Sequence, residues 1–267
     1  METKLWQQDR NVQKAENKNK KRFPHISVEY VEVVYQPKYN SLTGRIVGAE
    51  ALVRCYQGGK LLPLDKIIAY LEHKGLIKYL DELVIESVCK LQKILMDLTL
   101  KIPISVNVSR KNLCRNKMAT EYSAIFKEYN IPQELIPLEI TETVDAEDKV
   151  MSRYAKRLIA QGFVLQMDDF GSAYASLNNF AEIGYKTVKL DKKLIDNIGN
   201  PKGDILLQYL IACFKNLNLD IVAEGVETEQ QLQFLKDQGV TNIQGYYYSF
   251  PVQEAEFKRM LLRQLGV

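Results

Sequence analysis

Short β-rich segments alternate with longer amphipathic stretches along this chain, and that alternation limits the folds open to it. The strand candidates are rich in β-branched residues and are bounded by turn residues. Repeated strand–helix units predict a mainly parallel sheet covered by helices. The strands expected from the sequence are Val31–Gln36, Arg45–Leu52, Ile104–Val108, Leu138–Thr141, Val164–Met167, Thr187–Leu190, Asp220–Ala223 and Thr241–Ile243.

The segments between these strands carry apolar residues at helical spacing. We expect helical structure over Leu64–Asp97, Met151–Gln161, Asp204–Asn216 and Glu229–Gln238. Eight strand candidates in a chain of 267 residues suit an α/β fold of the (β/α)8 TIM-barrel type, which typically needs about 250 residues. Because no Pro-, Ser- or Gly-rich linker divides the chain, we expect one barrel domain over residues 23–267, preceded by a basic tail over residues 1–22.

Polar residues end or follow almost all of these apolar strands. A charged group in an apolar strand is costly unless it is paired or bound to a metal, and any single case is explained by a core ion pair. When polar residues recur at equivalent points of successive strand–helix units, a single cause is needed to explain all of them. Since strand C-termini converge on one face of a barrel, we expect these side chains to share one pocket. They are Glu50, Asn107, Glu139, Asp168, Asp169, Lys189, Glu224 and Gln244.

The chemistry of this set favours a hard divalent cation. Carboxylate and amide oxygens suit Mg²⁺ or Mn²⁺. The two histidines, His25 and His73, lie elsewhere, which disfavours a zinc hydrolase of the usual histidine type. Adjacent carboxylates at Asp168 and Asp169 suit two metal ions, a recurring arrangement for phosphodiester hydrolysis. Lys189 could position the attacking water, assist its deprotonation or neutralise transition-state charge, and the sequence leaves these three roles open.

Composition narrows the class of protein further. The chain is 46% hydrophobic and 26% charged, as in an ordinary globular protein. Residues 1–22 hold seven basic and three acidic residues, whereas the remainder of the chain is nearly neutral. The near-neutral charge of the remainder argues against a protein that binds long nucleic acid through its surface. The four cysteines form no C-x-x-C pair, and no stretch is apolar enough to act as a signal peptide or an integral membrane segment. We therefore expect a cytoplasmic protein.

Eight sequence strings, in order from about Val33 to Pro251, carry a resemblance to a known family. They are Y-Q-P-K-Y, E-A-L-V-R, V-N-V-S, E-I-T-E, D-D-F-G-S-A-Y-A-S-L, V-K-L-D, A-E-G-V-E-T and Q-G-Y-Y-Y-S-F-P. The chain resembles the EAL-domain phosphodiesterases, which cleave the bacterial second messenger cyclic di-GMP to linear pGpG. The resemblance implies a modified barrel whose first strand runs antiparallel to the others, two Mg²⁺ or Mn²⁺ ions per site, and a homodimer.

The resemblance also implies residue roles. Glu50, Asn107, Glu139 and Asp168 look like ligands of the first metal. Asp168 and Asp169 would serve the second, with Glu224 and Gln244 acting directly or through water. Lys189 matches the lysine that contacts the catalytic water, and Glu50 and Glu224 join it as expected catalytic residues. The expected substrate-binding residues are Gln36, Arg54, Glu227, Tyr246 and Pro251, and Glu142 matches the glutamate that anchors the loop after Asp169.

The chain departs from the family pattern at three points. Ala173 replaces a glycine in the loop Ser172-Ala173-Tyr174-Ala175, Cys55 stands where tryptophan is common, and Phe250 stands where lysine often precedes the proline. One alternative reading is a degenerate EAL domain that binds the nucleotide or a protein without hydrolysis, but the complete ligand set favours an enzyme. An enolase-like barrel also uses carboxylates and Mg²⁺, but would not explain Asn107, Gln244 or the order of the motifs.

Overall fold

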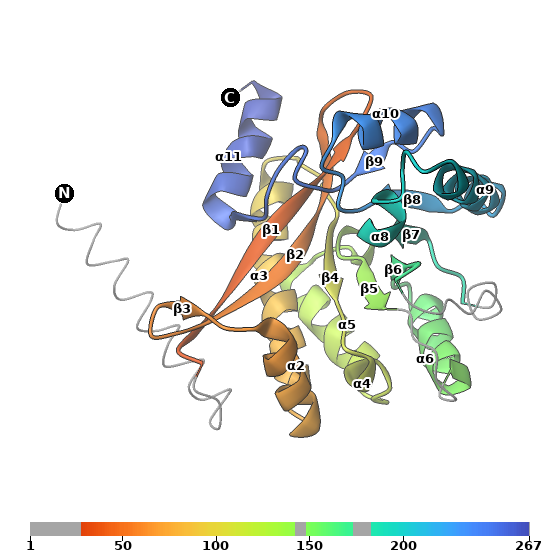
Figure 1. Ribbon diagram of the computed structural model, residues 1–267. Helices are drawn as coiled ribbons and strands as arrows, with labels where there is room; N and C mark the ends of the chain where they lie inside the picture. Colours follow the sequence, from red (N-terminus) through yellow and green to blue (C-terminus); the bar gives the residue numbers. More distant parts are fainter. Residues whose placement is uncertain (1–27, 142–147, 173–182, 267) are drawn as a thin grey trace.

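Eight strands close into a barrel in the computed structural model of the chain, which describes residues 28–141, 148–172 and 183–266 (Figure 1). Around the barrel the order is β1, β2, β4, β5, β6, β7, β8 and β9, and β9 pairs back onto β1. Their bounds are β1 Tyr30–Asn40, β2 Ile46–Gln57, β4 Ile104–Asn107, β5 Leu138–Thr141, β6 Leu165–Phe170, β7 Thr187–Leu190, β8 Asp220–Ala223 and β9 Asn242–Ile243. The predicted TIM-type barrel is confirmed.

The barrel closes through β1, which is antiparallel to both of its neighbours. On one side Gln36 pairs with Glu50 of β2, and on the other Tyr39 pairs with Ile243 of β9. The remaining neighbours, from β2 round to β9, pair in parallel. The expectation of an antiparallel first strand is therefore also confirmed. Two short strands lie outside the barrel ring: β3 (Lys60–Leu61) pairs with β2, and β10 (Val252–Gln253) pairs with β1.

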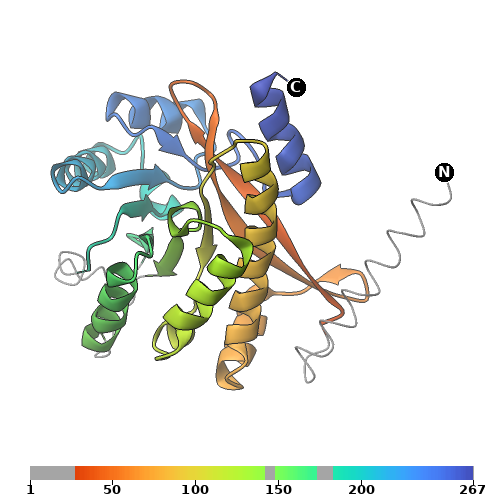
Figure 2. The same ribbon diagram turned by 180° about the vertical axis from the view of Figure 1, so that it is seen from behind.

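Helices lie around the outside of the strands (Figures 1 and 2). Their inward faces pack on the outward-facing apolar residues of the strands in one large cluster of buried side chains. None of the described helices is long and apolar enough to cross a membrane. The helices are α2 Leu64–His73, α3 Ile77–Asp97, α4 Arg110–Leu113, α5 Met118–Tyr129, the 3₁₀ turn Gln133–Leu135, α6 Asp148–Ala160, α8 Lys192–Ile195, α9 Pro201–Asn216, α10 Glu229–Asp237 and α11 Glu254–Leu265.

The sequence located the strands better than the helices. Three strands have the predicted bounds and the other five differ at their ends, β1 by four residues at its C-terminal end. The single predicted helix over Leu64–Asp97 is wrong, because the chain forms α2 and α3 there. Gly75, with φ 68, ends α2, and Leu76 donates its amide hydrogen to the Leu71 carbonyl at 2.8 Å. This left-handed glycine ends the helix although the apolar periodicity continues past it.

Two longer helices were not predicted, α5 and α11. In α5, Met118, Tyr122 and Phe126 are buried four residues apart, so the helical pattern was present in the sequence. In α11, Phe257 is fully buried and stacks on Tyr35 of β1 with the ring centroids 5.6 Å apart. This helix therefore covers the outer face of the antiparallel strand that closes the barrel (Figure 1).

Because Phe257 packs against the strand that closes the barrel, we expect Phe257→Ala to lower the free energy of unfolding by about 3–5 kcal/mol, the usual cost of removing a buried phenylalanine. Urea unfolding followed by circular dichroism measures this change. Leu265→Ala removes a 45% exposed leucine of the same helix and should change the free energy by less than about 1 kcal/mol. Equal effects of the two substitutions would contradict the packing role given to Phe257.

Candidate active site

A buried lysine lies among four carboxylates at the C-terminal end of the barrel strands. Lys189, on β7, is 1% exposed. The carboxylates come from four different places in the barrel: Glu50 within β2, Glu139 within β5, Asp168 within β6, and Glu224 directly after β8. The Lys189 Nζ lies 2.7 Å from Asp168 Oδ1, 2.7 Å from Glu224 Oε1, 2.8 Å from Glu139 Oε2 and 3.2 Å from Glu50 Oε2. The structure thus brings together the charged strand ends that the sequence singled out.

Two predicted amide residues complete the arrangement around Glu50. Asn107 Nδ2, on β4, donates to Glu50 Oε1 at 2.8 Å, and Gln244 Nε2 donates to Glu50 Oε2 at 2.7 Å. Gln244 Nε2 also contacts Gln36 Oε1 at 3.1 Å, so the expected substrate-binding residue Gln36 of β1 lies beside the cluster. Gln244 Oε1 is buried without a hydrogen-bond partner among the described residues. That orphaned oxygen is free to accept from a ligand or to bind a cation.

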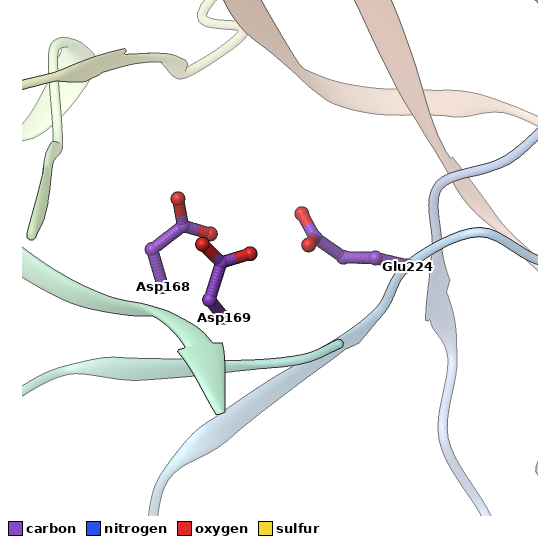
Figure 3. A group of neighbouring side chains, drawn as sticks. All are labelled: Asp168, Asp169 and Glu224. Atoms are coloured by element: carbon purple, nitrogen blue, oxygen red, sulfur yellow. The ribbon is translucent and has the colours of Figure 1, made fainter. Parts of the chain in front are cut away.

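The adjacent carboxylates of Asp168 and Asp169 lie on the same side of the chain, although neighbouring residues of a regular strand point to opposite faces. A bulge explains this: between Met167 and Phe170, β6 advances three residues while its partner β7 advances two. Asp169 adopts φ 55, a left-handed conformation that aspartate tolerates better than most residues. Figure 3 shows both carboxylates directed toward Glu224.

The donor set fits a hard divalent cation. Carboxylate oxygens of Asp168, Asp169 and Glu224 lie within 4.8 Å of one another (Figure 3). With Glu50 and Glu139, five carboxylates stand in the described cluster against the ammonium groups of Lys189 and Lys38. The excess of negative charge, the oxygen-only ligands and the absence of histidine among the described site residues suit Mg²⁺ or Mn²⁺ rather than zinc.

The crowding of charge shifts the pKa values of the cluster. Burial and the neighbouring carboxylates raise the pKa of Glu224 to about 8, despite the opposing effect of Lys189. Burial, with the neighbouring acids, also raises the pKa values of Glu50 and Asp168. Burial alone would raise the pKa of Glu139, but Lys189 and Lys38 outweigh it and hold the pKa below its usual range. Without a bound cation, part of the cluster therefore holds protons near neutral pH.

A cavity of about 340 Å³ opens beside the cluster. Besides cluster residues, it is lined by Gln36, Glu227 and Tyr246, three residues expected to bind substrate. Glu227 pairs with Lys192 at 3.1 Å, and the Tyr246 ring, 52% exposed, lies 4.2 Å from the Phe250 ring centroid. Sequence reasoning missed Lys192 and the neighbouring Asp191, although Asp191 ends the V-K-L-D string that was singled out for Lys189.

Other predicted residues lie away from this cavity or outside the described residues. Arg54, on β2, is half-buried, donates to the Val53 carbonyl at 2.9 Å, and is not among the residues that line the cavity. Pro251 follows Phe250 and also does not line it. Glu142 and the loop positions Ala173 to Ala175 lie outside the described residues, so their expected roles stay predictions.

A glycine allows the chain after β9 to turn into the site. A Cβ atom at Gly245 would lie 2.2 Å from the Val226 carbonyl oxygen, too close for any side chain. The Gly245 position therefore lets the segments that follow β8 and β9 pack backbone to backbone. That close approach places Gln244 and Glu224, the residues at the two strand ends, on the same cluster.

The fold and the site together place this chain in one class of protein: TIM-type barrels that have one antiparallel strand and carry a buried acidic cluster inside the barrel. Comparison with known families then identifies the family: the EAL domain family model matches residues 23–251. This chain belongs to the EAL domain family.

Curated relatives cover most of the chain. It is 29% identical to the cyclic di-GMP phosphodiesterase PdeR of Escherichia coli (strain K12) over 98% of this chain and 38% of that protein. It is 29% identical to the cyclic di-GMP phosphodiesterase RocR of Pseudomonas aeruginosa over 85% of this chain and 58% of that protein. The chain therefore spans only part of the length of these relatives.

Solved structures agree with the fold. The PaMucR phosphodiesterase in its c-di-GMP complex superposes with a TM-score of 0.78 at 26% identity, covering 85% of this chain and 94% of that one. An EAL domain protein from Listeria monocytogenes superposes with a TM-score of 0.74 at 26% identity, covering 86% and 91% of the two chains. Both matches support the barrel described above.

Lys189 offsets the repulsion among four buried carboxylates, so Lys189→Met should destabilise the metal-free protein in a pH-dependent way. A carboxyl whose pKa is raised by folding contributes stability at low pH that is lost as the pH rises through its folded pKa. We expect a loss of about 3–5 kcal/mol at pH 8, the usual cost of breaking a buried ion pair. The loss should be clearly smaller at pH 5.5, where the carboxyls can take up protons.

Urea unfolding in EDTA at both pH values measures this difference. Lys186→Met is the matched control, because Lys186 lies 3.7 Å from Asp220 and its side chain is 63% exposed. It should change the free energy of unfolding by less than about 1 kcal/mol at either pH. A loss for Lys189→Met that does not depend on pH would contradict the charge balance described here.

Proposed function

We propose that this chain is a divalent-metal-dependent phosphodiesterase that hydrolyses cyclic di-GMP to linear pGpG. The observation that carries the proposal is the buried carboxylate cluster around Lys189, whose excess negative charge and oxygen ligands suit hard cations. The names of curated relatives in the same family, among them two cyclic di-GMP phosphodiesterases, support the choice of substrate.

The proposed metal ligands are the polar strand ends. Glu50, Asn107, Glu139 and Asp168 would hold one Mg²⁺ or Mn²⁺ ion, and Asp168 and Asp169 a second, with Glu224 and Gln244 acting directly or through water. Such an ion pair stabilises the attacking and leaving oxygens of a phosphodiester. The β6 bulge supports the two-ion proposal, because it turns both Asp168 and Asp169 toward Glu224.

In this proposal Lys189 donates hydrogen bonds next to the reacting phosphate, and Glu224 holds or releases a proton there. Lys189 Nζ lies 2.7 Å from Glu224 Oε1, so the two groups form a buried acid–base pair at the cavity wall. Lys189 can direct an N–H donor toward an attacking water or a phosphate oxygen once the carboxylates are engaged elsewhere. Glu224, whose pKa is raised to about 8, can hold a proton on its carboxyl near neutral pH.

The cavity beside the cluster would take part of the nucleotide. Gln36 offers an amide, Glu227 a carboxylate acceptor and Tyr246 an exposed ring at its wall, groups that suit the polar edge and the face of a base. Arg54 and Pro251 would contact substrate from outside this cavity, and the Arg54 guanidinium suits a phosphate. We also propose that Glu142 anchors the loop after Asp169, that residues 1–22 form a tail to the 23–267 barrel, and that the protein is a cytoplasmic homodimer.

The direct test is turnover. The purified chain should convert cyclic di-GMP to pGpG in the presence of Mg²⁺ or Mn²⁺, and chromatography of the nucleotides measures this conversion. EDTA should abolish the reaction. Glu50→Gln should lower kcat by more than about 100-fold, because losing even the partner of a metal ligand typically costs 10–100-fold. Glu256→Gln, which changes a carboxylate of α11 paired with Arg259 at 2.7 Å, is the control and should keep full turnover.

Nucleotide binding without any turnover in either metal would overturn the proposed hydrolysis and would leave a receptor. Wild-type turnover in the Glu50→Gln variant would overturn the site assignment instead. A loss of turnover supports the assignment when the variant unfolds at the wild-type temperature.

The raised pKa of Glu224 makes metal binding pH-dependent. At pH 7 its carboxyl, with a pKa of about 8, is mostly protonated in the metal-free protein, so a cation must displace that proton. We expect the Mn²⁺ dissociation constant to fall as the pH rises from 6.5 to 8.5. Isothermal titration calorimetry in buffers of different ionisation enthalpy should show proton release at pH 7, and Glu224→Gln should reduce it. Binding that neither releases protons nor varies with pH would contradict this account.

A further inference from the structure

A second buried lysine reaches the cluster from the strand that closes the barrel. Lys38, on β1, is 6% exposed. Its Nζ donates to Glu139 Oε1 at 2.9 Å and to Ser105 Oγ at 2.7 Å. The Y-Q-P-K-Y string contains this lysine, but no local pattern assigns it a role, because its acceptors lie 67 and 101 residues away along the chain.

The two lysines divide the oxygens of Glu139 between them. Lys189 contacts Oε2 at 2.8 Å, and Lys38 contacts Oε1 at 2.9 Å. Lys189 is shared among four carboxylates, whereas in the described part of the chain Lys38 pairs with Glu139 alone. A cation that enters the cluster competes for the partners of Lys189 but leaves the Lys38 contact on the other oxygen of Glu139 in place.

The need for such a dedicated partner follows from burial. Glu139 is 0% exposed, and a carboxylate so deep in the barrel is strongly destabilising unless it stays paired. Lys38 holds the orientation of the Glu139 carboxylate through one oxygen, so that the other oxygen faces the cluster. Loss of a group that holds a ligand in this way typically weakens metal binding by about 10–100-fold.

The surrounding strands fix Lys38 in turn. Ser105 lies on β4 two residues before Asn107, and its Oγ also contacts the carbonyl of Ala49, the residue before Glu50, at 3.2 Å. Gly48 lies opposite Lys38 in the β1–β2 register, and a Cβ there would lie 3.7 Å from the Lys38 Cδ and 3.2 Å from the Pro103 carbonyl oxygen. The lysine stem therefore packs directly beside the Gly48 backbone, where an added Cβ would be in ordinary contact with the stem and would be crowded by the Pro103 carbonyl.

We infer that Lys38 is a positioning residue that fixes Glu139 for cation binding and so sets the metal affinity of the site. The inference rests on the proposed metal site and does not depend on the identity of the substrate. The direction of the change in cation affinity separates this role from a simple charge effect. A lysine acting only as a nearby positive charge would repel a cation, so its removal would tighten binding. A positioning lysine has the opposite effect, and its removal weakens binding.

Mn²⁺ binding to the purified chain, followed by electron paramagnetic resonance of the free ion, separates these two roles. We expect Lys38→Met to weaken Mn²⁺ binding by about 10–100-fold, the usual effect of removing a partner of a metal ligand. Lys186→Met removes an exposed lysine and should bind Mn²⁺ as the wild type does. Unchanged or tighter binding by a folded Lys38→Met variant would overturn the inference.

A double-mutant cycle tests whether Lys38 acts through Glu139. Glu139→Gln removes the charge that Lys38 holds, so adding Lys38→Met to that variant should weaken Mn²⁺ binding little further. Full additivity of the two losses would overturn the inference. If Lys38→Met does not fold, Ser105→Ala provides the test, since it keeps the lysine but removes one of its two acceptors. It should bind Mn²⁺ more weakly than the wild type, and unchanged affinity would overturn the inference.

These outcomes are distinct from failure of the proposed function. Wild-type Mn²⁺ binding without cyclic di-GMP turnover would overturn the proposed hydrolysis and leave the role of Lys38 standing. Wild-type Mn²⁺ binding that Lys38→Met leaves unchanged would overturn only the role of Lys38. No Mn²⁺ binding by the wild type would overturn both the metal site and this inference.

Discussion

The ammonium group of Lys189 is the point on which this end of the barrel depends. It is 1% exposed and lies within 3.2 Å of four carboxylates that come from β2, β5, β6 and the residue after β8. Four ionised carboxylates buried so close together would be strongly destabilising without it. The antiparallel β1 strand contributes to the same balance, because it closes the barrel and supplies Lys38 to the most deeply buried carboxylate, Glu139. Fold closure and charge balance are therefore properties of the same strands.

The balance is incomplete, and the imbalance is what makes the cluster useful. Five carboxylates stand against two lysines among the described residues of the cluster, and burial together with the neighbouring carboxylates raises the pKa of Glu224 to about 8. Such a site destabilises the metal-free protein and attracts hard cations for the same electrostatic reason. The left-handed backbone of Asp169 adds local strain that the bulge in β6 sustains. Stability is given up where the proposed chemistry takes place.

The sequence predicted the barrel and the members of the cluster, because both follow from local patterns. Apolar strands such as Leu138–Thr141 have a short-range signature, and the polar residues within or directly after them are visible without a structure. Lys38 was missed because its role depends on a partner 101 residues away. The bulge that turns Asp169 inward was missed because it depends on the register between β6 and β7. The break at Gly75 was missed because apolar periodicity continues through it.

Anomalous diffraction tests most directly whether the carboxylate cluster binds divalent cations, because it locates the ions without relying on turnover. Crystals grown with Mn²⁺ are compared with crystals grown in EDTA. We expect Mn²⁺ peaks bound by Asp168 together with other carboxylates of the cluster, while Lys38 keeps its contact with Glu139. The metal site would be contradicted if, at saturating Mn²⁺, Lys189 still contacts all four carboxylates and no anomalous peak lies among them. The lysine would then be a structural counter-ion, and the carboxylates would not form a metal site.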